Sequence, residues 1–501
     1  MLQALVLVAG MTSLAAEMSA SRLLEPYFGT SLFVWANIIG MILIYLSVGY
    51  YLGGRIADRY PKNHYLYALT TVAAVTLLLV PFIARPILRF SLVSFQNYSV
   101  GIFYGSLAGV ILLFAVPITL LGCVSPFAIR LAVERVEQAG NVAGSLYALS
   151  TVGSIIGTFV SVFVFIPNVG TARTIIIFSL ALLVISALGL GRRRIWALVV
   201  VGVALAIVPP GPVKAEPNMI YEHESPYNYI QVVREDGLTE LLLNEGVAIH
   251  SIYKPGIVLT RSYWDYVLVA PYFNPLHRQE SLRRVAIVGL AAGTMAKELT
   301  AVYGPIPIDG VEIDPNIVDV GRRFFDMHEQ NLNVYATDGR YFMETTHEQY
   351  DLISMDAYHT PYIPFHLTTK EFFQDVDDHL TPDGAAVINV GRTASDARLV
   401  DVIARTMNQA FPSVYVIDVP APPGVQIQNS LVVGTKSPGS LSQALARLDG
   451  LQQPLLREVA AQAAPHTIEI QPTDGLIFTD DRAPVEQLVD QMIVDYLRTS
   501  P

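Results

Sequence analysis

Cysteine is almost absent from this sequence, since Cys123 is the only one in 501 residues. A lone cysteine excludes an intramolecular disulfide and any metal cage built from several cysteines. Cys123 stands in an apolar run, which is typical of a small buried residue rather than a reactive thiol. We therefore expect no disulfide framework and no metal site.

Charge is also scarce, at 15% of residues, and it is divided unevenly along the chain. Residues 1–216 contain 13 Lys and Arg against 6 Asp and Glu, a net charge of +7, whereas residues 217–501 contain 19 against 37, a net charge of −18. This division predicts a membrane domain, with the lipid bilayer as its partner, followed by an acidic domain outside the bilayer. The acidic half disfavours nucleic acid as a partner, because phosphate backbones need basic surface.

Long apolar stretches fill the predicted membrane domain, residues 1–210, and most of them approach the ~20 residues that a helix needs to cross a bilayer. About seven spans are expected, at residues 2–24, 31–52, 65–84, 101–129, 142–166, 172–191 and 195–210. Lys and Arg are concentrated in alternate loops, which places the amino terminus in the cytoplasm. Seven spans would then place the acidic half outside the cell.

Glu17 lies inside the first apolar stretch. An unpaired carboxylate in a bilayer is costly, so Glu17 should face the bundle interior, be protonated or pair with Arg22. Two roles remain open for it: binding or passing a cation, and tying helices together.

The acidic half begins with a linker and a small β subdomain, residues 211–280, in which alternation over 227–243 predicts two strands. Residues 281–501 alternate short strands with helices. This order is typical of a Rossmann-like α/β domain with a doubly wound, mostly parallel sheet.

A glycine and alanine turn, Gly289 to Gly293, joins the first strand of this domain to its first helix. Glycines at such a turn either let a ligand approach the backbone or let the strand and helix pack closely. Glu312 lies 23 residues after Gly289, in the next strand. A carboxylate at this spacing can accept hydrogen bonds from ribose hydroxyls, which favours nucleoside binding.

Acidic residues end three successive strands of the predicted sheet: Glu312, Asp338 and Asp356. A single acid at a strand end is usually a turn or helix cap. Three acids at the same carboxyl edge, where doubly wound folds bind ligands, predict a site.

Residues 285–389, with Glu312, Asp338-Gly339 and Asp356, resemble the spermidine synthase family, aminopropyltransferases with the fold of S-adenosylmethionine-dependent methyltransferases. Glu17, the loop 53–59, and segments 147–153 and 479–486 are similar to bacterial membrane-fused members of that family. The resemblance implies a methyltransferase-type α/β domain fused to a multi-span helical membrane domain.

The resemblance also implies roles for individual residues. Glu312 matches the family's ribose-binding acid. Asp338 and Gly339 match its adenine-side pair. Asp356 matches the carboxylate that takes a proton from the attacking amine. Gly289 and Gly293 complete the expected nucleoside site. The residues expected to contact the amine substrate are Tyr227, Tyr263, Asp265, Tyr358, His359, Asp480 and Asp481.

The expected amine site departs from the family pattern. Ala292 stands where the family has an aspartate that grips the diamine, His359 replaces a second aspartate, and Ile249 occupies the place of a glutamine. Two missing carboxylates remove about 1–4 kcal/mol each from the binding of a dication. We therefore expect putrescine to bind poorly unless Asp265, Asp480 or Asp481 substitute, with His359 and His366 as either bases or rim residues.

These observations favour a membrane-anchored aminopropyltransferase that uses decarboxylated S-adenosylmethionine as co-substrate and a small-molecule amine as acceptor. Two alternatives remain open: methyl transfer from S-adenosylmethionine, and a membrane transporter that senses polyamines or nucleosides without catalysis. A homodimer is also left open.

The expected position is a multi-pass protein of the cell membrane, but its sidedness stays open. Seven spans would place the acidic half outside, but S-adenosylmethionine compounds are made in the cytosol, so we favour a cytoplasmic position for this half.

Overall fold

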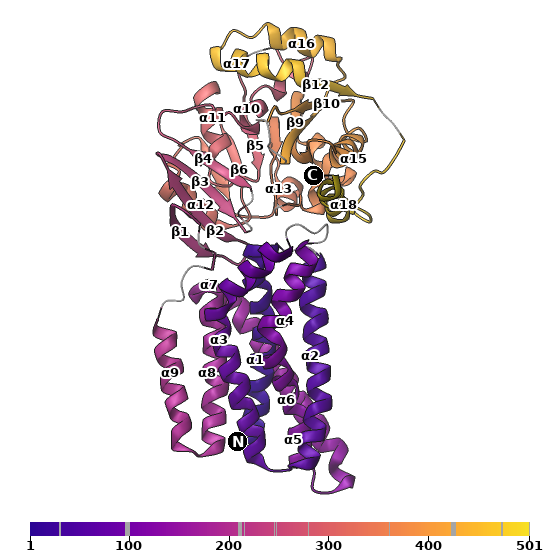
Figure 1. Ribbon diagram of the computed structural model, residues 1–501. Helices are drawn as coiled ribbons and strands as arrows, with labels where there is room; N and C mark the ends of the chain where they lie inside the picture. The colour runs from indigo at the N-terminus through magenta and orange to yellow at the C-terminus, as the bar shows by residue number, and fades with distance from the viewer. Residues whose placement is uncertain are drawn as a thin grey trace. The chain divides into compact units, whose positions relative to one another are not determined.

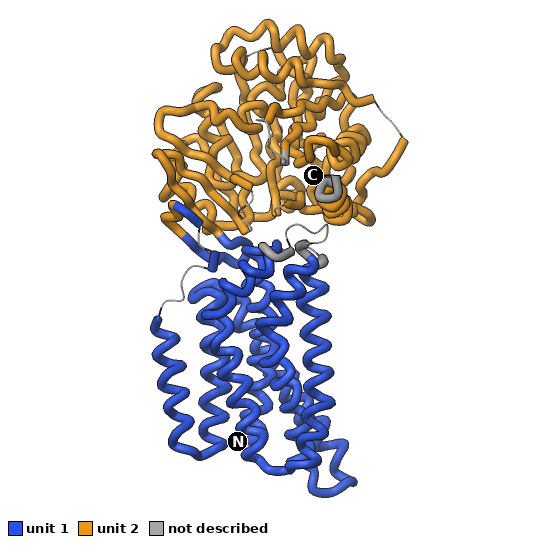
Figure 2. Tube along the Cα trace, in the orientation of Figure 1, with its two compact units in different colours: residues 1–217, 222–229 blue, residues 218–221, 230–501 orange. Residues whose placement is uncertain are grey.

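The structure is a computed structural model, and it divides into two compact units (Figures 1 and 2). The first comprises residues 1–217 and 222–229, and the second comprises residues 218–221 and 230–501. The described residues are 1–29, 32–95, 101–208, 213–214, 216–244, 246, 248–278, 280–359, 361–421, 427–471 and 474–499.

The first unit is a bundle of long apolar helices. They are α1 (Leu2–Phe28), α2 (Leu32–Arg59), α3 (Asn63–Phe95), α4 (Gly101–Gly122), α5 (Val124–Ala132), α6 (Ala139–Val160), α7 (Ile166–Val169), α8 (Thr171–Leu190) and α9 (Trp196–Ile207). Small residues let α6 approach α1: a side chain at Gly153 would lie 2.2 Å from the carbonyl oxygen of Leu7. Such small-residue contacts are typical of helices that pack inside a membrane.

Six helical segments among the described residues are long and apolar enough to cross a membrane: Leu2–Phe28, Val34–Arg59, Asn63–Leu92, Phe103–Ala132, Val136–Val169 and Thr171–Leu190. The seventh expected span corresponds to α9, whose 12 residues are shorter than the ~20 that a bilayer needs.

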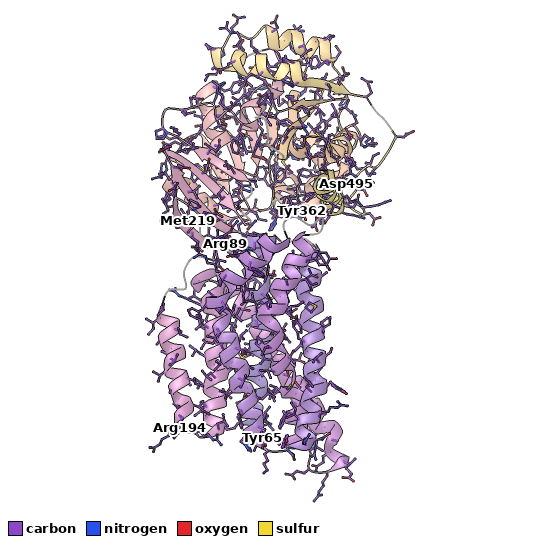
Figure 3. All side chains as sticks on the ribbon, in the orientation of Figure 1. Tyr65, Arg89, Arg194, Met219, Tyr362 and Asp495 are labelled. Carbon is purple, nitrogen blue, oxygen red and sulfur yellow. The ribbon has the colours of Figure 1, made fainter. Side chains whose placement is uncertain are left out.

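Helix α9 nevertheless returns the chain along the bundle. Tyr65 and Arg194 lie at one end of the bundle and Arg89 lies at the other (Figure 3). After α9, the carbonyl of Val213 accepts a hydrogen bond of 2.7 Å from the hydroxyl of Tyr27, near the carboxyl end of α1. Among the described residues, α9 therefore runs along the bundle, but it is too short to join the six candidate spans.

A small antiparallel sheet precedes the α/β domain, in the strand order β1-β2-β3-β4. Its strands are β1 (Met219–Glu224), β2 (Tyr229–Glu235), β3 (Leu238–Leu243) and β4 (Ile249–Tyr253). Strands β2 and β3 confirm the two that alternation predicts over 227–243, and β1 and β4 extend the sheet on both sides. Alternate residues of β3 are buried, as one covered face requires.

The large sheet has the order β12-β10-β11-β9-β8-β5-β6-β7. Strands β9 (Leu380–Thr393), β8 (Tyr350–Met355), β5 (Val285–Val288), β6 (Ile308–Val311) and β7 (Leu332–Tyr335) run parallel. This part confirms the predicted Rossmann-like α/β domain. Strands β11 (Ile427–Thr435), β10 (Ser413–Asp418) and β12 (Thr467–Ile470) pair antiparallel and were not predicted, so the sheet is mixed.

Helices cover both faces of this sheet, because successive residues of a buried strand point to opposite sides. In β5, Val285 and Ile287 pack in one apolar cluster and Ala286 and Val288 in another. The helices of the domain are α10 (Tyr263–Val267), α11 (Thr294–Tyr303), α12 (Pro315–Phe324), α13 (Gly339–Thr345), α14 (Lys370–Asp378), α15 (Arg398–Met407), α16 (Leu441–Asp449), α17 (Pro454–Ala463) and α18 (Val485–Thr499).

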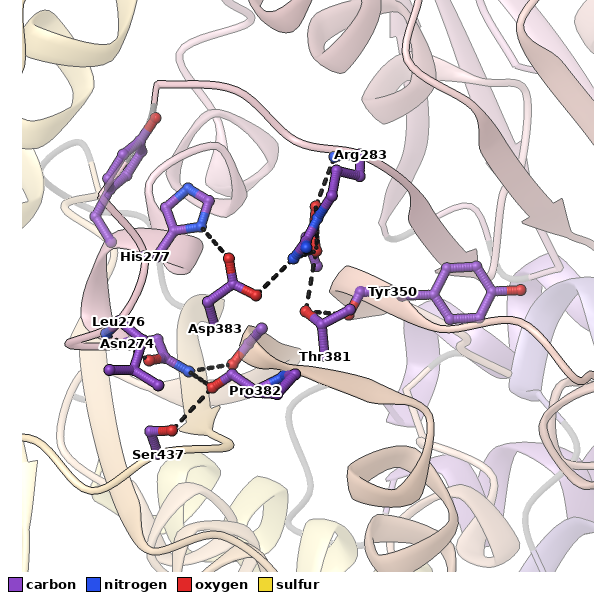
Figure 4. Close-up of polar contacts among 12 residues, drawn as sticks. Asn274, Leu276, His277, Arg283, Tyr350, Thr381, Pro382, Asp383 and Ser437 are labelled. Carbon is purple, nitrogen blue, oxygen red and sulfur yellow. Dashed lines mark hydrogen bonds and ion pairs between the residues drawn. The ribbon is translucent and has the colours of Figure 1, made fainter.

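A polar cluster ties the strands together at the amino edge of the parallel sheet (Figure 4). The guanidinium of Arg283 contacts Asp351 and Asp383 at 2.5 Å each, and the Thr381 hydroxyl donates to Asp351 at 2.9 Å. Burial raises the pKa of Asp351, but the hydrogen bonds from Arg283 and Thr381 outweigh it and hold that pKa below its usual value.

Removal of this cation should destabilise the domain. Asp351 is 2% exposed, so Arg283→Ala leaves a buried carboxylate with fewer hydrogen-bond donors. We expect the free energy of unfolding to fall by about 1–2 kcal/mol, a range that is kept small because Arg283 itself is exposed to solvent. The stabilisation from a lowered pKa is present above the unfolded-state pKa and is lost as the pH falls through the folded-state value. The difference between wild type and variant should therefore shrink below about pH 4.

Equilibrium unfolding of the detergent-solubilised chain in urea measures this loss, with the exposed Arg278 changed to Ala as the control. Equal effects of the two substitutions, or a difference that persists at low pH, would contradict the assignment.

Candidate active site

The turn from Gly289 to Gly293 packs against the protein itself. Gly289 has a φ of +93°, and a side chain there would lie 2.5 Å from the backbone carbonyl of Asp356. Gly293 has a φ of +92°, and a side chain there would lie 2.6 Å from the sulfur of Met327. Of the two roles open for these glycines, the structure shows close packing, and contact with a nucleoside stays a prediction.

Glu312 follows strand β6 and is joined to this turn. Its carboxylate accepts hydrogen bonds from the backbone N–H groups of Ala291 at 2.9 Å and of Asp314 at 3.0 Å. Burial raises the pKa of Glu312 to about 7, and these hydrogen bonds oppose the rise. A carboxylate oxygen can accept more than one hydrogen bond, so Glu312 retains capacity for a hydroxyl donor.

Two apolar side chains beside Glu312 were not predicted. Ile313 is 41% exposed and Tyr335 is 40% exposed, and the carbonyl of Tyr335 accepts the Glu312 N–H at 3.0 Å. The side chains of Ile313 and Tyr335 offer apolar surface next to Glu312, of the kind that a flat nucleobase can contact. Their positions directly after β6 and at the end of β7 were the signals available in the sequence.

Asp338 caps helix α13. One carboxylate oxygen accepts hydrogen bonds from the backbone N–H groups of Arg340 at 2.9 Å and Tyr341 at 3.1 Å, and the other lies 3.0 Å from Nε2 of His366. Gly339 permits this arrangement, because a side chain there would lie 2.4 Å from Val288. The structure thus gives Asp338 a capping role, and it brings His366 to Asp338.

Asp356 follows strand β8 and is held by three donors. Its Oδ2 accepts hydrogen bonds from the hydroxyl of Tyr263 at 3.0 Å and from the indole of Trp264 at 3.1 Å. Its Oδ1 accepts one from the amide of Asn389 at 2.9 Å. Burial raises the pKa of Asp356 to about 6, although the three hydrogen bonds favour the charged form.

Trp264 and Asn389 are therefore functional candidates that the residue patterns did not single out. Tyr358 completes the group: its hydroxyl donates to the carbonyl of Asn389 at 3.0 Å and accepts the N–H of Gly391 at 2.8 Å. The structure brings Tyr263 to Asp356 and joins Tyr358 to the next strand, β9, and the amine-binding roles of both tyrosines stay predictions.

Histidines lie nearby. His359 and Tyr362 exchange backbone hydrogen bonds of 2.8 and 2.9 Å. Burial lowers the pKa of His250 to about 4, and His359 adds to this effect. His250, which follows the partly exposed Ile249 in β4, is thus brought within electrostatic range of His359, which the sequence did not indicate.

Two predicted amine-site acids are engaged elsewhere. Asp265 is buried and accepts hydrogen bonds from the backbone N–H groups of Thr260 and Arg261, at 2.9 and 3.1 Å. Asp480 accepts two hydrogen bonds from Arg340, at 2.6 and 2.7 Å, and one of 2.7 Å from the Thr369 hydroxyl. These two acids fix loops, and the structure does not bring them to Asp356.

The remaining predicted residues lie as follows. Asp481 is exposed on the turn after Asp480, and Tyr227, 43% exposed, belongs to the first unit. Ala292 is fully buried and packs with the apolar side chains of α12. The expected contacts of Asp481 and Tyr227 with the amine, and the loss of an acid from the amine site at Ala292, stay predictions.

Glu17 is half-buried in α1. In the part of the chain that the structure describes, no hydrogen bond or ion pair involves its carboxylate, and Arg22 instead pairs with Glu25 at 3.2 Å. Of the three alternatives for Glu17, the structure does not show the pairing with Arg22, and an interior position and a protonated state stay predictions.

The order of the parallel strands and the acids at their carboxyl ends define a methyltransferase-like α/β domain. Residues 273–440 match the family model of the spermine/spermidine synthase domain. This match covers about a third of the chain, and the described residues before it include six helices long and apolar enough to cross a membrane. This match confirms the resemblance seen in the sequence.

Curated relatives agree with this assignment. A probable polyamine aminopropyl transferase of Bifidobacterium longum is 31% identical over 304 residues, which cover 56% of this chain and 65% of that protein. A polyamine aminopropyltransferase of Vibrio vulnificus is 28% identical over 236 residues, which cover 46% of this chain and 76% of that protein. The chain thus spans slightly less than two thirds of the first relative.

Among solved structures, a probable spermidine synthase from Corynebacterium glutamicum has 22% identity and a TM-score of 0.40, and the match covers 52% of this chain and 98% of that one. Spermidine synthase from Thermotoga maritima has 16% identity and a TM-score of 0.39, with 49% and 83% covered.

The contact between Gly289 and Asp356 yields a test of this geometry. Gly289→Ala should destabilise the chain by roughly 2–5 kcal/mol, because it adds left-handed backbone strain to a clash with backbone atoms. Gly304→Ala is the matched control: Gly304 has a φ of +81°, and nothing lies within 4 Å of a side chain there. Thermal unfolding of both variants separates the clash from the strain, and equal destabilisation would contradict the proposed contact.

Proposed function

We propose that this protein is a membrane-anchored aminopropyltransferase that moves an aminopropyl group from decarboxylated S-adenosylmethionine to an amine. The observation that carries the proposal is the Asp356 carboxylate, held by three donors at the carboxyl edge of the sheet. The spermine/spermidine synthase match over residues 273–440 and the aminopropyltransferase relatives support it.

The donor would bind along the carboxyl edge. Glu312 would accept hydrogen bonds from the ribose hydroxyls, and the exposed faces of Ile313 and Tyr335 would contact the base. Asp338 and Gly339 would lie on the adenine side. The bound donor supplies a sulfonium leaving group, which makes the adjacent carbon electrophilic.

Asp356 would act as the general base. An ammonium ion has no free electron pair, so the amine must lose a proton before or as it attacks. Its electron pair then forms a carbon–nitrogen bond while the carbon–sulfur bond breaks, and the electrons of that bond return to sulfur. Asp356 takes the proton, and methylthioadenosine leaves as a neutral thioether.

The pKa of about 6 suits this role. At neutral pH most Asp356 is ionised and can accept a proton, and a carboxylate with a raised pKa is a stronger base than an ordinary one. The hydrogen bonds from Tyr263, Trp264 and Asn389 prevent burial from raising the pKa further.

The acceptor is proposed to be an amine that presents one cationic group. Ala292 is neutral and buried, and Asp265 and Asp480, which might have replaced the missing acids, hold loops instead. A second ammonium group would lose its solvation without a carboxylate partner, which is unfavourable. A monoamine should therefore compete well with a diamine.

Substitution of Asp356 tests the reaction. Asp356→Asn should lower the release of methylthioadenosine by at least about 100-fold, and Asp449→Asn, an exposed acid on α16, serves as control. Because Asp356 must be ionised, the wild-type rate should fall below about pH 6. Asn389→Leu removes a hydrogen bond that lowers the pKa, so its acid limb should move to higher pH.

The measurement is product analysis by chromatography with the purified chain and a panel of monoamines and diamines. If no amine in the panel leads to release of methylthioadenosine, the proposal is contradicted. Release of S-adenosylhomocysteine from S-adenosylmethionine would favour methyl transfer instead.

We also propose that the α/β domain lies on the side of the membrane opposite to the amino terminus. Loops 55–62, 130–135 and 192–194 carry basic residues and lead into α3, α6 and α9, respectively. Loops rich in Lys and Arg usually stay in the cytoplasm. After α9, Val213 contacts Tyr27 at the end of the bundle where α1 ends. This proposal reverses the expectation of a cytoplasmic domain, which was based on the cytosolic supply of the donor.

The single cysteine makes sidedness measurable. In a Cys123→Ser background, Asp449→Cys should react with a membrane-impermeant maleimide in intact cells, whereas Lys62→Cys should react only after permeabilisation. Both side chains are exposed within their own units. The opposite labelling pattern would place the α/β domain in the cytoplasm.

A further inference from the structure

A pair of buried carboxyl groups lies next to the residues that hold Asp356. Asp265 of α10 is 3% exposed and Glu298 of α11 is 1% exposed. The hydroxyl of Thr260 lies 3.0 Å from a carboxyl oxygen of each. The aminopropyl-transfer scheme gives neither acid a task.

We propose that Asp265 and a protonated Glu298 form a positioning pair that fixes Tyr263 and Trp264 on the carboxylate of Asp356. This inference rests on the proposed function for its kinetic consequences. The pair itself follows from contacts within the second unit.

Asp265 has the surroundings of a carboxylate. Besides the Thr260 hydroxyl, it accepts the backbone N–H groups of Thr260 and Arg261. One oxygen of Glu298 lies 3.0 Å from the shared hydroxyl, and its other oxygen is buried without a hydrogen-bond partner among the described residues. The Thr260 hydroxyl has a single proton, so it can donate to only one of the two acids, and the other acid must donate to it. Because two adjacent buried carboxylates repel, one proton should remain between them, and Glu298 is the group that carries it.

The pair holds a strained loop. Arg261 is a non-glycine residue with a φ of +62°, a backbone conformation that persists only where neighbouring contacts enforce it. Its N–H donates to Asp265 at 3.1 Å. The hydrogen bond thus ties the strain at Arg261 to the helix that begins two residues later.

Tyr263 and Trp264 are the first two residues of that helix, α10, and Asp265 is the third. Their donors reach the same oxygen of Asp356. Release of Asp265 would therefore free the loop and the start of α10 together, and both donors would move relative to Asp356.

A cavity of about 600 Å³ gives the loop room to move. It is lined by residues 256–261 of the loop, by Glu298 and by part of α17. The other charged groups at this cavity are Lys254, Arg261, Lys297 and Glu458. Arg261 pairs with Glu458, and Lys297 pairs with Glu329 at 2.6 Å, so Asp265 is the charged group that acts most directly on Glu298.

The pH dependence has a definite sign. Burial, followed by the charge of Asp265, raises the pKa of Glu298 well above its usual value. A carboxyl group that stays protonated in the folded chain but ionises in the unfolded chain lowers stability as the pH rises above its unfolded value. Wild type should therefore lose stability from about pH 5 upward, until Glu298 itself ionises.

The test compares two substitutions of one residue in the full chain. Glu298→Gln keeps a donor toward the Thr260 hydroxyl but cannot ionise, so it should keep kcat within about threefold and remove the fall in stability with pH. Glu298→Leu removes the donor, so it should lower kcat roughly 10–100-fold with a smaller effect on KM, through misplaced donors. It should also shift the acid limb of the rate profile, because Asp356 loses hydrogen bonds that lower its pKa.

Asp449→Asn, an exposed acid on α16 with no contact to this loop among the described residues, is the control and should match wild type in kcat and in acid limb. Thermal unfolding against pH does not require activity, and neither does quenching of Trp264 fluorescence in a background where Trp35 and Trp196 are changed to Phe. They therefore test the pair even if Glu298→Leu fails to fold or if no aminopropyl transfer is found.

Three results would overturn the pair: the same pH dependence of unfolding in Glu298→Gln and wild type, equal loss of kcat in the Gln and Leu variants, or an unchanged acid limb in Glu298→Leu. A missing product with every amine, combined with the expected unfolding behaviour, would overturn the proposed function alone.

Discussion

The arrangement of this domain depends on a buried carboxylate, Asp356, that must be surrounded by donors to stay ionised. Burial alone would raise its pKa beyond the range in which it can act as a base at neutral pH. Three donors oppose this effect, and they come from α10 and β9, which are far apart in the sequence. The positions of α10 and β9 are therefore both constrained by the side chain of Asp356.

The glycine turn shows how backbone packing serves the same end. Gly289 lacks the side chain that would meet the carbonyl of Asp356, so the turns after β5 and β8 lie in contact. Glu312 accepts the N–H of Ala291 in the same turn. The turn is thus held between two acids, which fixes their separation before any ligand arrives, and such preorganisation reduces the cost of binding.

Acidic residues in this domain divide into two groups by their partners. The first group accepts hydrogen bonds that hold loops and strands, and it contains Asp265, Asp351 and Asp480. Glu312 and Asp356 are also hydrogen-bonded, but burial outweighs those bonds, and their pKa values rise to about 7 and about 6. A net charge of −18 over the second half therefore says little about its ligand, because local contacts decide what each carboxylate does.

The sequence by itself determined the two-part organisation, the parallel α/β sheet and the acids at its strand ends. Hydrophobic length, strand and helix alternation and strand-end position are local properties, and local properties can be read along the chain. The antiparallel strands β10 to β12 and the donors Trp264 and Asn389 were decided by the tertiary structure. So was the loop-holding role of Asp480, because its donors Arg340 and Thr369 are more than 100 residues away in the sequence. The donors to Asp338 and Asp265 lie within five residues, but the sequence did not show which of these acids would be held by its neighbours.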